Sequence, residues 1–348
     1  MKTLPEFSIE GRQIGYNHDP LVIAELGINH GGSLGVAFEM VDAAARAGVE
    51  IIKHQTHIVE DEMNRLAKKV IPSHTKESIY EIMEKCALDE EEEIELQNYV
   101  KSKGIIFIST PFSRAAVNRL VKMDVPAFKI GSGECNNYPL IKHIATFKKP
   151  VILSTGMNTI DSVRVAVDIL RESKIPFALL HTTNVYPTPD HLVRLGAMTQ
   201  LIEKFPDAVH GLSDHTTSNH ACFGAVALGA SVLERHFTDT MDREGPDIAC
   251  SMDEQACRDL IAGVKRIKKM RGGVKGPVDE EKATIDFAYA SVVTIKPVSK
   301  GEIFTKENIW VKRPGTGEIL AVDYEGVIDR KATRDLENDE MLKWSDID

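Results

Sequence analysis

Two lysines and several hydroxyl and amide side chains are the residues of this chain whose types first indicate binding chemistry. Lys53 and Lys129 each stand at or near the end of a short apolar segment. If these segments are nearby strands, both ammonium groups enter one enclosed site, where they repel each other unless an anion lies between them. Neutral donors of the kind that hold a phosphate follow other such segments, at Ser132, Ser154, Asn184 and Ser213. The residues therefore predict a site for an anionic substrate, although a salt bridge to Glu25 or Glu134 would also account for either lysine.

Two histidines point to a metal ion in the same site. His215 and His236 end two apolar segments that would be neighbouring strands, so their imidazoles can meet one divalent ion. Two histidines with oxygen ligands and water suit Mn²⁺ or a similar ion better than structural zinc, which prefers closed sites rich in thiolate. Glu134 and Asp247 are candidate carboxylate ligands, directly or through a water, and either is also a candidate general base. The alternative is that both histidines are core residues with satisfied hydrogen bonds.

Eight apolar segments carry these polar residues at their ends. They lie at residues 21–26, 50–53, 105–109, 127–130, 150–153, 177–180, 209–212 and 231–234. Polar and apolar residues do not alternate in them, which is typical of parallel strands buried on both faces. Helical patterns lie between them, at residues 37–47, 90–101, 115–123, 160–173, 198–204, 220–228 and 253–270. This alternation predicts an α/β fold of the (β/α)8 TIM-barrel type, with a doubly wound sheet as its rival.

The polar residues at the segment ends favour the barrel. In a (β/α)8 barrel the active site lies at the C-terminal mouth, where the strands end. One such residue alone is weak evidence, because most polar residues at strand ends cap helices or face solvent, but here every segment has one. Besides the residues named above, the set contains Asn29, His30, Gln55, Ser109, Thr110, Thr155, His181, Thr182, Tyr186, Asp214, Glu234, Arg235 and Asp239.

The chain changes character after residue 271. Residues 272–277 (GGVKGP) are rich in turn formers, and residues 285–348 contain short strand-like pieces at 290–295 and 309–311 without a long amphipathic helix. We expect a catalytic barrel at residues 1–271, a linker at 272–284 and a small second domain at 285–348.

The composition excludes several classes of protein. The chain has 348 residues, with 42 Lys and Arg against 52 Asp and Glu, and its net charge of −10 argues against a nucleic-acid binder. No segment approaches the roughly 18 apolar residues of a membrane span, and the N-terminus lacks the apolar core of a signal peptide. The five cysteines are scattered without metal-site spacing, which predicts reduced thiols. We therefore expect a cytoplasmic protein without a membrane partner.

Several motifs together resemble the bacterial sialic acid synthases. They are residues 25–30 (ELGINH), 53–62 (KHQTHIVEDE), 109–114 (STPFSR), 129–137 (KIGSGECNN), 154–157 (STGM), 184–188 (NVYPT), 211–215 (GLSDH) and 234–238 (ERHFT). Residues 287–293 (FAYASVV) and 310–315 (WVKRPG) resemble the antifreeze-like domain that follows the barrel in that family, a SAF domain of the β-clip type. The resemblance covers nearly the whole chain.

The resemblance implies an activity and an assembly. The family condenses phosphoenolpyruvate with open-chain N-acetylmannosamine and water to give N-acetylneuraminate and phosphate by C–O cleavage. It uses a divalent metal, for which Mn²⁺ is expected here, with Mg²⁺ or Co²⁺ as alternatives. It also implies a domain-swapped homodimer, in which the antifreeze-like domain of one subunit covers the barrel mouth of the other.

The resemblance also implies roles for individual residues. Lys53 and Thr110 would hold the carboxylate of phosphoenolpyruvate, and its phosphate would be held by Lys129, Ser132, Ser154, Asn184 and Ser213. His215 and His236 would bind the metal. The residues that face the sugar would be Glu25, Gln55, Tyr186 and Asp247, with Arg313 of the partner's small domain at its N-acetyl group. Glu134 would be the general base, and Glu25 and Asp247 would join it as catalytic carboxylates.

One departure from the family pattern concerns the sugar. Relatives commonly read Pro-Gly-Asn where this chain reads Pro72-Ser73-His74, so His74 is the expected sugar-binding residue there. Related synthases that make legionaminic or pseudaminic acid use 2,4-diacetamido-2,4,6-trideoxy sugars, and this chain is alternatively one of them. A metal-dependent aldolase and a non-catalytic barrel with a binding module are the remaining alternatives. The first would leave the anion cluster unexplained, and the second predicts degenerate strand ends.

Overall fold

The computed structural model describes residues 4–71 and 77–348. The chain divides into two compact units, residues 1–271 and 272–348. Among the described residues, no helix is long and apolar enough to cross a membrane.

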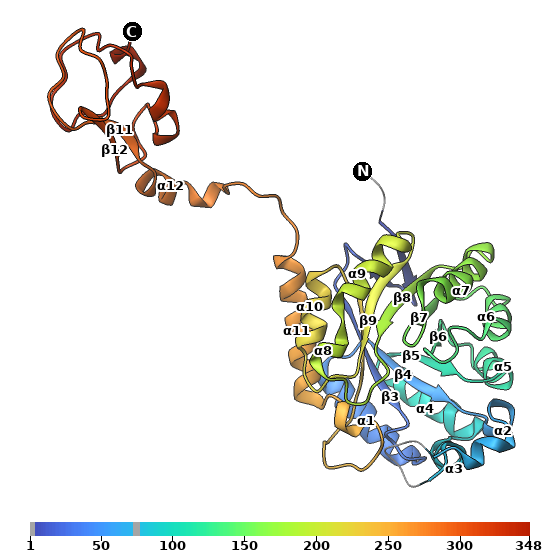
Figure 1. Ribbon diagram of the computed structural model, residues 1–348. Helices are drawn as coiled ribbons and strands as arrows, with labels where there is room; N and C mark the ends of the chain where they lie inside the picture. The colour runs from blue at the N-terminus through green and yellow to red at the C-terminus, as the bar shows by residue number, and fades with distance from the viewer. Residues whose placement is uncertain (1–3, 72–76) are drawn as a thin grey trace. The chain divides into compact units, whose positions relative to one another are not determined.

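The first unit is a closed barrel of eight parallel strands (Figure 1). Each strand pairs with the next along the chain, and the last pairs with the first to close the ring. The strands are β3 (Leu21–Gly27), β4 (Ile51–Thr56), β5 (Ile106–Pro111), β6 (Phe128–Ile130), β7 (Val151–Ser154), β8 (Phe177–Thr182), β9 (Val209–Asp214) and β10 (Val232–His236). The predicted (β/α)8 barrel is thereby confirmed, and each predicted segment contains one strand. Most strands continue past the predicted end, so that several of the expected site residues lie on the strands themselves.

Helices surround the barrel and pack against the outer face of its strands (Figure 1). They are α1 (Leu34–Ala47), α2 (Val59–Glu62), α3 (Ile79–Cys86), α4 (Glu90–Ser102), α5 (Arg114–Lys122), α6 (Tyr138–Ala145), α7 (Ile160–Glu172), α8 (Asp190–Val193), α9 (Leu195–Lys204), α10 (His220–Ala227) and α11 (Glu254–Met270). All seven predicted helices are present. The sequence analysis missed α6, whose Pro139 reads as a helix breaker although proline fits the first turn of a helix. It also missed the short helices α2, α3 and α8.

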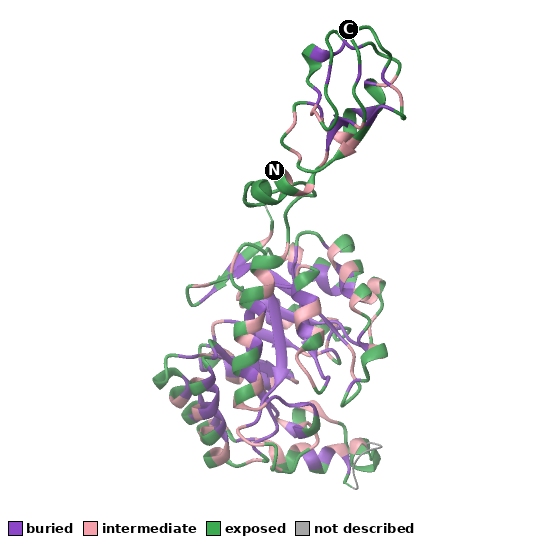
Figure 2. Ribbon diagram, turned by 90° about the vertical axis from the view of Figure 1, so that its left-hand side faces the viewer, coloured by how far each residue is buried: buried purple, intermediate pink, exposed green. Residues whose placement is uncertain are grey.

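The two faces of the strands bury different sets of side chains, and the strands are buried along almost their whole length (Figure 2). On β3, Leu21 and Ile23 belong to an apolar cluster inside the barrel, whereas Val22 and Ala24 pack under the helices. This alternation follows from the two-residue period of a strand and repeats around the ring. It decides which polar residues can reach the mouth.

A hairpin that the sequence analysis did not predict precedes the barrel. It consists of β1 (Glu6–Ile9) and β2 (Arg12–Gly15), which pair antiparallel. Phe7, Ile9 and Ile14 are buried in the same cluster as Leu21 at the start of β3. The hairpin therefore closes the N-terminal end of the barrel and leaves the C-terminal mouth for the site.

The second unit is a small domain with its own core. It contains the helix α12 (Lys282–Ala288) and an antiparallel pair, β11 (Ser291–Thr294) and β12 (Ile309–Lys312), near the two predicted strand-like pieces. Isolated bridges, some of them from β11 to loops, supply the rest of its pairing. Its core is formed by residues such as Val292, Phe304 and Leu342. The predicted linker, residues 272–284, contains a 3₁₀ turn at Asp279–Glu281 and the first residues of α12.

Candidate active site

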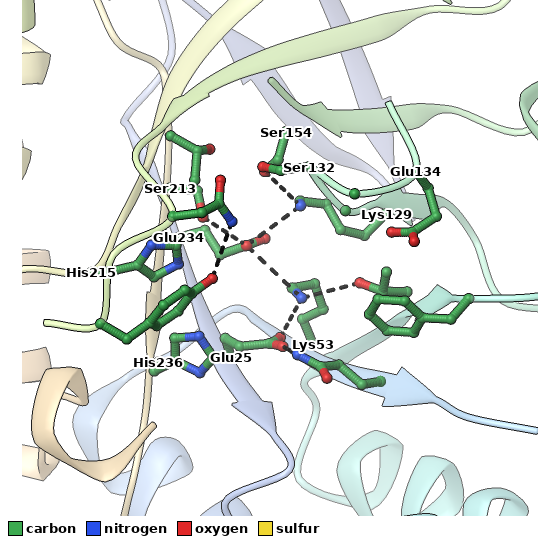
Figure 3. A pocket seen from close by; sticks show the side chains of 18 residues that line it. Glu25, Lys53, Lys129, Ser132, Glu134, Ser154, Ser213, His215, Glu234 and His236 are labelled. Atoms are coloured by element: carbon green, nitrogen blue, oxygen red, sulfur yellow. Dashed lines mark hydrogen bonds and ion pairs between the residues drawn. The ribbon is translucent and has the colours of Figure 1, made fainter. Parts of the chain in front are cut away.

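A pocket of about 580 Å³ opens at the C-terminal mouth of the barrel, and Figure 3 shows the side chains that line it. Most of the predicted site residues meet there. They are Glu25, Lys53, Gln55, Thr110, Lys129, Ser132, Glu134, Ser154, Asn184, Tyr186, Ser213, His215 and His236. The period of the strands explains this convergence, because each of these positions on a strand has the same parity as the apolar residues of the inner cluster. Glu25, for example, follows Leu21 and Ile23 at intervals of two.

The two lysines are paired with carboxylates. Lys53 Nζ lies 2.6 Å from Glu25 Oε2, which is the salt bridge considered as the alternative for this lysine. For Lys129 the same alternative named other carboxylates than the structure does. Lys129 Nζ lies 3.5 Å from Glu234 Oε1 and forms no ion pair with Glu25 or Glu134 among the described residues. Glu234 Oε1 also lies 3.8 Å from Lys53 Nζ. The inner wall of the mouth is therefore a cluster of two ammonium groups and two carboxylates (Figure 3).

Hydroxyl groups form further hydrogen bonds with this cluster. Lys53 donates to Thr110 Oγ1 at 3.1 Å and Lys129 donates to Ser154 Oγ at 2.7 Å. Ser213 Oγ donates to Glu234 Oε1 at 3.1 Å. These hydroxyls belong to the predicted anion-binding set, so both lysines are held beside further donors.

The pKa values of the two carboxyl groups in this cluster shift in opposite directions. Burial raises the pKa of Glu25 to about 7; Lys53 opposes this rise and Glu234 adds to it. Burial also acts on Glu234, but the ammonium groups of Lys129 and Lys53 outweigh it and lower the pKa of that carboxyl. Burial lowers the pKa of Lys129. At neutral pH, Glu234 is therefore ionised and supplies the negative charge beside the two lysines.

Glu234 is the functional residue whose importance the sequence analysis missed. It was noted at the end of its segment and given no role. A signal was present, because Glu234 stands two residues before His236 and two after the inward-facing Val232, whereas Arg235 has the opposite parity. Applying the two-residue period to each strand end would have selected it.

Glu134 stands on the other side of the pocket, in the loop after β6. Burial raises its pKa to about 7, and the negative charge of Glu62 on α2 adds to the rise. Its Oε2 is buried without a hydrogen-bond partner among the described residues. A carboxyl group that titrates near neutral pH and faces a pocket suits proton transfer at that pH.

Ser132 and Asn184 meet where the backbone comes very close. The Gly156 amide donates to Ser132 Oγ at 3.0 Å, and a Cβ at Gly156 would lie 1.8 Å from Asn184 Oδ1. Any larger residue at this position would push the Asn184 side chain aside. Asn184 Nδ2 also donates to Tyr186 Oη at 3.2 Å, so two predicted substrate ligands hold each other in place.

His215 and His236 lie together at the mouth, with ring centroids 5.5 Å apart. Burial and the neighbouring His236 lower the pKa of His215 to about 4, and burial and Lys53 lower that of His236 to about 3. Both rings are therefore neutral at pH 7, which is the state that binds metals. His215 Nδ1 lies 2.9 Å from the Thr183 carbonyl oxygen, a contact that fixes the ring orientation.

These imidazoles fit a divalent ion through two nitrogen ligands. His236 Nδ1 is buried without a hydrogen-bond partner among the described residues, and Asp247 Oδ2 lies 3.7 Å from it. Across the described parts of the chain, no three His, Cys, Asp or Glu side chains are grouped to hold a metal. A carboxylate ligand from Glu134 or Asp247, directly or through a water, therefore stays a prediction.

Two predicted site residues do not line this pocket, and a third is outside the described residues. Asp247 stands beside His236 and does not line the pocket itself. Arg313 belongs to the second unit, where it is exposed and lies over the ring of Phe287, 5.6 Å from its centroid. His74 lies outside the described residues.

The closed barrel, with a mouth of paired lysines, hydroxyl groups and neutral imidazoles, is the architecture of a (β/α)8 enzyme. A sequence profile of the NeuB family matches residues 40–276, and a profile of the SAF domain matches residues 289–348. The chain belongs to the NeuB family of sialic acid synthases. This confirms the resemblance found in the sequence.

Individual relatives agree with this membership. An uncharacterized protein of Methanocaldococcus jannaschii is 38% identical over 99% of both chains. The N,N'-diacetyllegionaminic acid synthase of Campylobacter jejuni is 36% identical over 93% of this chain and 98% of its own. The crystal structure of the N-acetylneuraminic acid synthetase of Leptospira borgpetersenii superposes with a TM-score of 0.74 and 29% identity, covering 81% of this chain and 95% of that one.

Proposed function

We propose that this chain condenses phosphoenolpyruvate with open-chain N-acetylmannosamine and water, giving N-acetylneuraminate and inorganic phosphate. The observation that carries the proposal is the juxtaposition of two buried lysines, each bonded to a hydroxyl group, with two neutral imidazoles in one pocket. The lysines suit a substrate with two anionic groups, and the imidazoles suit a metal.

The distribution of donors supports a defined orientation of phosphoenolpyruvate. Lys129 and Ser154 stand beside Ser132, Asn184 and Ser213, which together would hold the phosphate. Lys53 and Thr110 would hold the carboxylate. The substrate would thus lie along the lysine pair, with its reacting carbon atoms toward the open side of the pocket.

The reaction would form a carbon–carbon bond and then break a carbon–oxygen bond. C3 of phosphoenolpyruvate attacks the aldehyde carbon of the sugar, the aldehyde oxygen takes up a proton to become a hydroxyl group, and the cation left at C2 is captured by water. Glu134 accepts one proton of that water. The C2–O bond to phosphate then breaks, phosphate leaves with the electrons of that bond and takes up a proton, and the new hydroxyl group at C2 loses its proton to become the ketone carbonyl. A divalent ion such as Mn²⁺, held by His215 and His236, would supply Lewis-acid polarisation of the aldehyde oxygen.

The side chains around the imidazoles suit the sugar. Gln55 and Glu25 are hydrogen-bonded to each other at 2.7 Å and face the pocket, and Tyr186 packs on His215 with ring centroids 4.1 Å apart. We propose that Arg313 reaches the N-acetyl group of the sugar from the SAF domain of a partner subunit, in a domain-swapped homodimer. Its exposed position leaves the guanidinium accessible for that role.

A second acceptor sugar is favoured by one comparison. The relative from C. jejuni is named as an N,N'-diacetyllegionaminic acid synthase. This supports 2,4-diacetamido-2,4,6-trideoxymannose as the alternative substrate, with the same donor and the same chemistry. The departure at Ser73 and His74 falls in the segment where the sequence predicts a sugar contact.

The test is phosphate release from phosphoenolpyruvate with Mn²⁺ and each sugar in turn. We expect release with N-acetylmannosamine that is lost on His236→Ala substitution. Release with the diacetamido sugar alone would keep the reaction and change the acceptor. If neither sugar gives phosphate while pyruvate serves as the donor, the chain is an aldolase and the proposal is wrong.

A further inference from the structure

A chain of hydrogen bonds runs from helix α2 into the sugar-facing side of the pocket. Glu62 Oε2 lies 2.8 Å from His57 Nδ1, and His57 Nε2 lies 3.1 Å from Gln55 Oε1. The Gln55 amide nitrogen donates to Glu25 Oε1 at 2.7 Å. Both ring nitrogens of His57 thus face oxygen atoms.

The imidazole of His57 is held so that it cannot turn. It is 4% exposed and stacks on Phe112, with ring centroids 4.4 Å apart and planes 12° from parallel. Helix α2, which carries Glu62, is fixed in turn by Asp61, whose carboxylate accepts from the Ala115 amide at 2.8 Å at the start of α5. The segment after β4 therefore packs against the loop after β5 and the start of α5.

The position of His57 determines which way the Gln55 amide faces. A carboxamide that is bonded on one side only can turn over and exchange its oxygen for its nitrogen. Because His57 engages the oxygen, the NH₂ group is directed at Glu25 and into the pocket. We propose that His57, held by Glu62, is a positioning residue that fixes the Gln55 amide for recognition of the acceptor sugar. This inference rests on the proposed function.

Substitutions of Glu62 and of His57 should affect Glu134 differently, so that the roles of the two residues can be distinguished. The charge of Glu62 contributes to the raised pKa of Glu134, whose other charged neighbour of note is Lys129. Glu62→Gln should therefore move the acidic limb of the pH–rate profile to lower pH, because removing a nearby negative charge lowers the pKa of Glu134. His57→Phe leaves the Glu62 carboxylate in place and should not move that limb downward.

The decisive experiment compares His57→Phe with the unsubstituted chain. Phenylalanine keeps the ring on Phe112 and removes both hydrogen bonds. The matched control is His143→Phe, because half-buried His143 on α6 also bonds a carboxamide oxygen through Nε2, Asn118 Oδ1 at 2.8 Å, but does not line the pocket. We expect His57→Phe to raise the KM for the sugar by about tenfold, the scale of one lost hydrogen bond, and to leave the KM for phosphoenolpyruvate within about twofold. His57→Gln, which restores a donor, should recover part of the loss.

Several results would overturn the inference. An unchanged KM for the sugar would do so, as would an equal rise of both KM values with a fall in melting temperature, since that describes general damage. If the unsubstituted chain is inactive with both sugars, the proposed function fails separately. Crystal structures of the parent and of His57→Phe then decide the positioning role. A Gln55 amide that leaves Glu25 in the variant supports it, and one that stays in place refutes it.

Discussion

Replacing Glu234 by glutamine tests whether the lysine pair is an anion site. Glu234 Oε1 lies 3.5 Å from Lys129 Nζ and 3.8 Å from Lys53 Nζ, and all three side chains are buried. At an effective dielectric constant of about 20, each contact corresponds to roughly 4–5 kcal/mol of Coulomb attraction. Desolvation offsets part of this, and the loss of one partner from a buried ion pair typically costs about 3–5 kcal/mol. We expect the substitution to reduce the free energy of unfolding by that amount.

The informative measurement is denaturant unfolding of Glu234→Gln with and without phosphoenolpyruvate. The substrate brings negative charge to the two buried lysines, which lack the Glu234 carboxylate in the variant, so it should stabilise the variant more than it stabilises the parent. Glu134→Gln is the control, because it removes a carboxyl group of the same pocket that forms no ion pair with a lysine among the described residues. The reasoning is refuted if Glu234→Gln unfolds at the parent's denaturant concentration, or if the substrate stabilises both proteins equally.

Four further predictions follow from the geometry. The pKa of Glu134 is about 7, against a usual 4.5. The folded chain therefore holds a proton between these pH values that the unfolded chain has lost, so this group's contribution to stability should be lost as pH rises over that interval. The free energy of unfolding, measured against pH, should fall less steeply there in Glu134→Gln than in the parent. Activity that needs the carboxylate should rise over the same interval. Chelation should abolish phosphate release, and added Mn²⁺ should restore it. Arg313→Ala and His236→Ala chains, each inactive or weak alone, should recover activity when mixed and re-associated, because a swapped dimer then contains one intact site; no recovery would contradict the swap. Ile14→Ala should lower the unfolding free energy by about 2–5 kcal/mol, because this side chain is buried in the closed end of the barrel, and an unchanged melting curve would show that the hairpin does not stabilise the barrel.

The parts of this molecule that local patterns encode were predictable. The eight buried strands read as apolar runs, and the polar residues after them read as a barrel mouth, because both signals lie in consecutive residues. The ion-pair partner of Lys129 could not be predicted in this way. Glu234 is distant in the sequence and is brought close only when β10 closes the ring against β3. The hairpin β1–β2 was missed for a similar reason. The hairpin buries Ile14 against strands that come later in the chain, and the residues of the hairpin alone do not show this packing.

The role of His57 illustrates a different limit. It lies in the motif of residues 53–62, but no pattern there gave it a role of its own. Its position is set by the loop after β5, through Phe112 and the anchoring of α2 on α5. Residues that act through another side chain leave no pattern of their own. They emerge only when hydrogen bonds are followed outward from a residue that faces the pocket, here Gln55.

Strand β10 shows how one short segment serves both chemistry and support. On its inner face it presents Glu234 and His236 to the pocket. On its outer face Arg235 is buried, and its guanidinium donates to the Thr216 carbonyl oxygen at 2.7 Å and to Asn219 Oδ1 at 2.6 Å. Thr216 directly follows His215, so the same strand that carries one imidazole fixes the loop that carries the other. Because side chains alternate along β10, Arg235 can hold the loop of His215 from the outer face while His236 faces the pocket from the inner face.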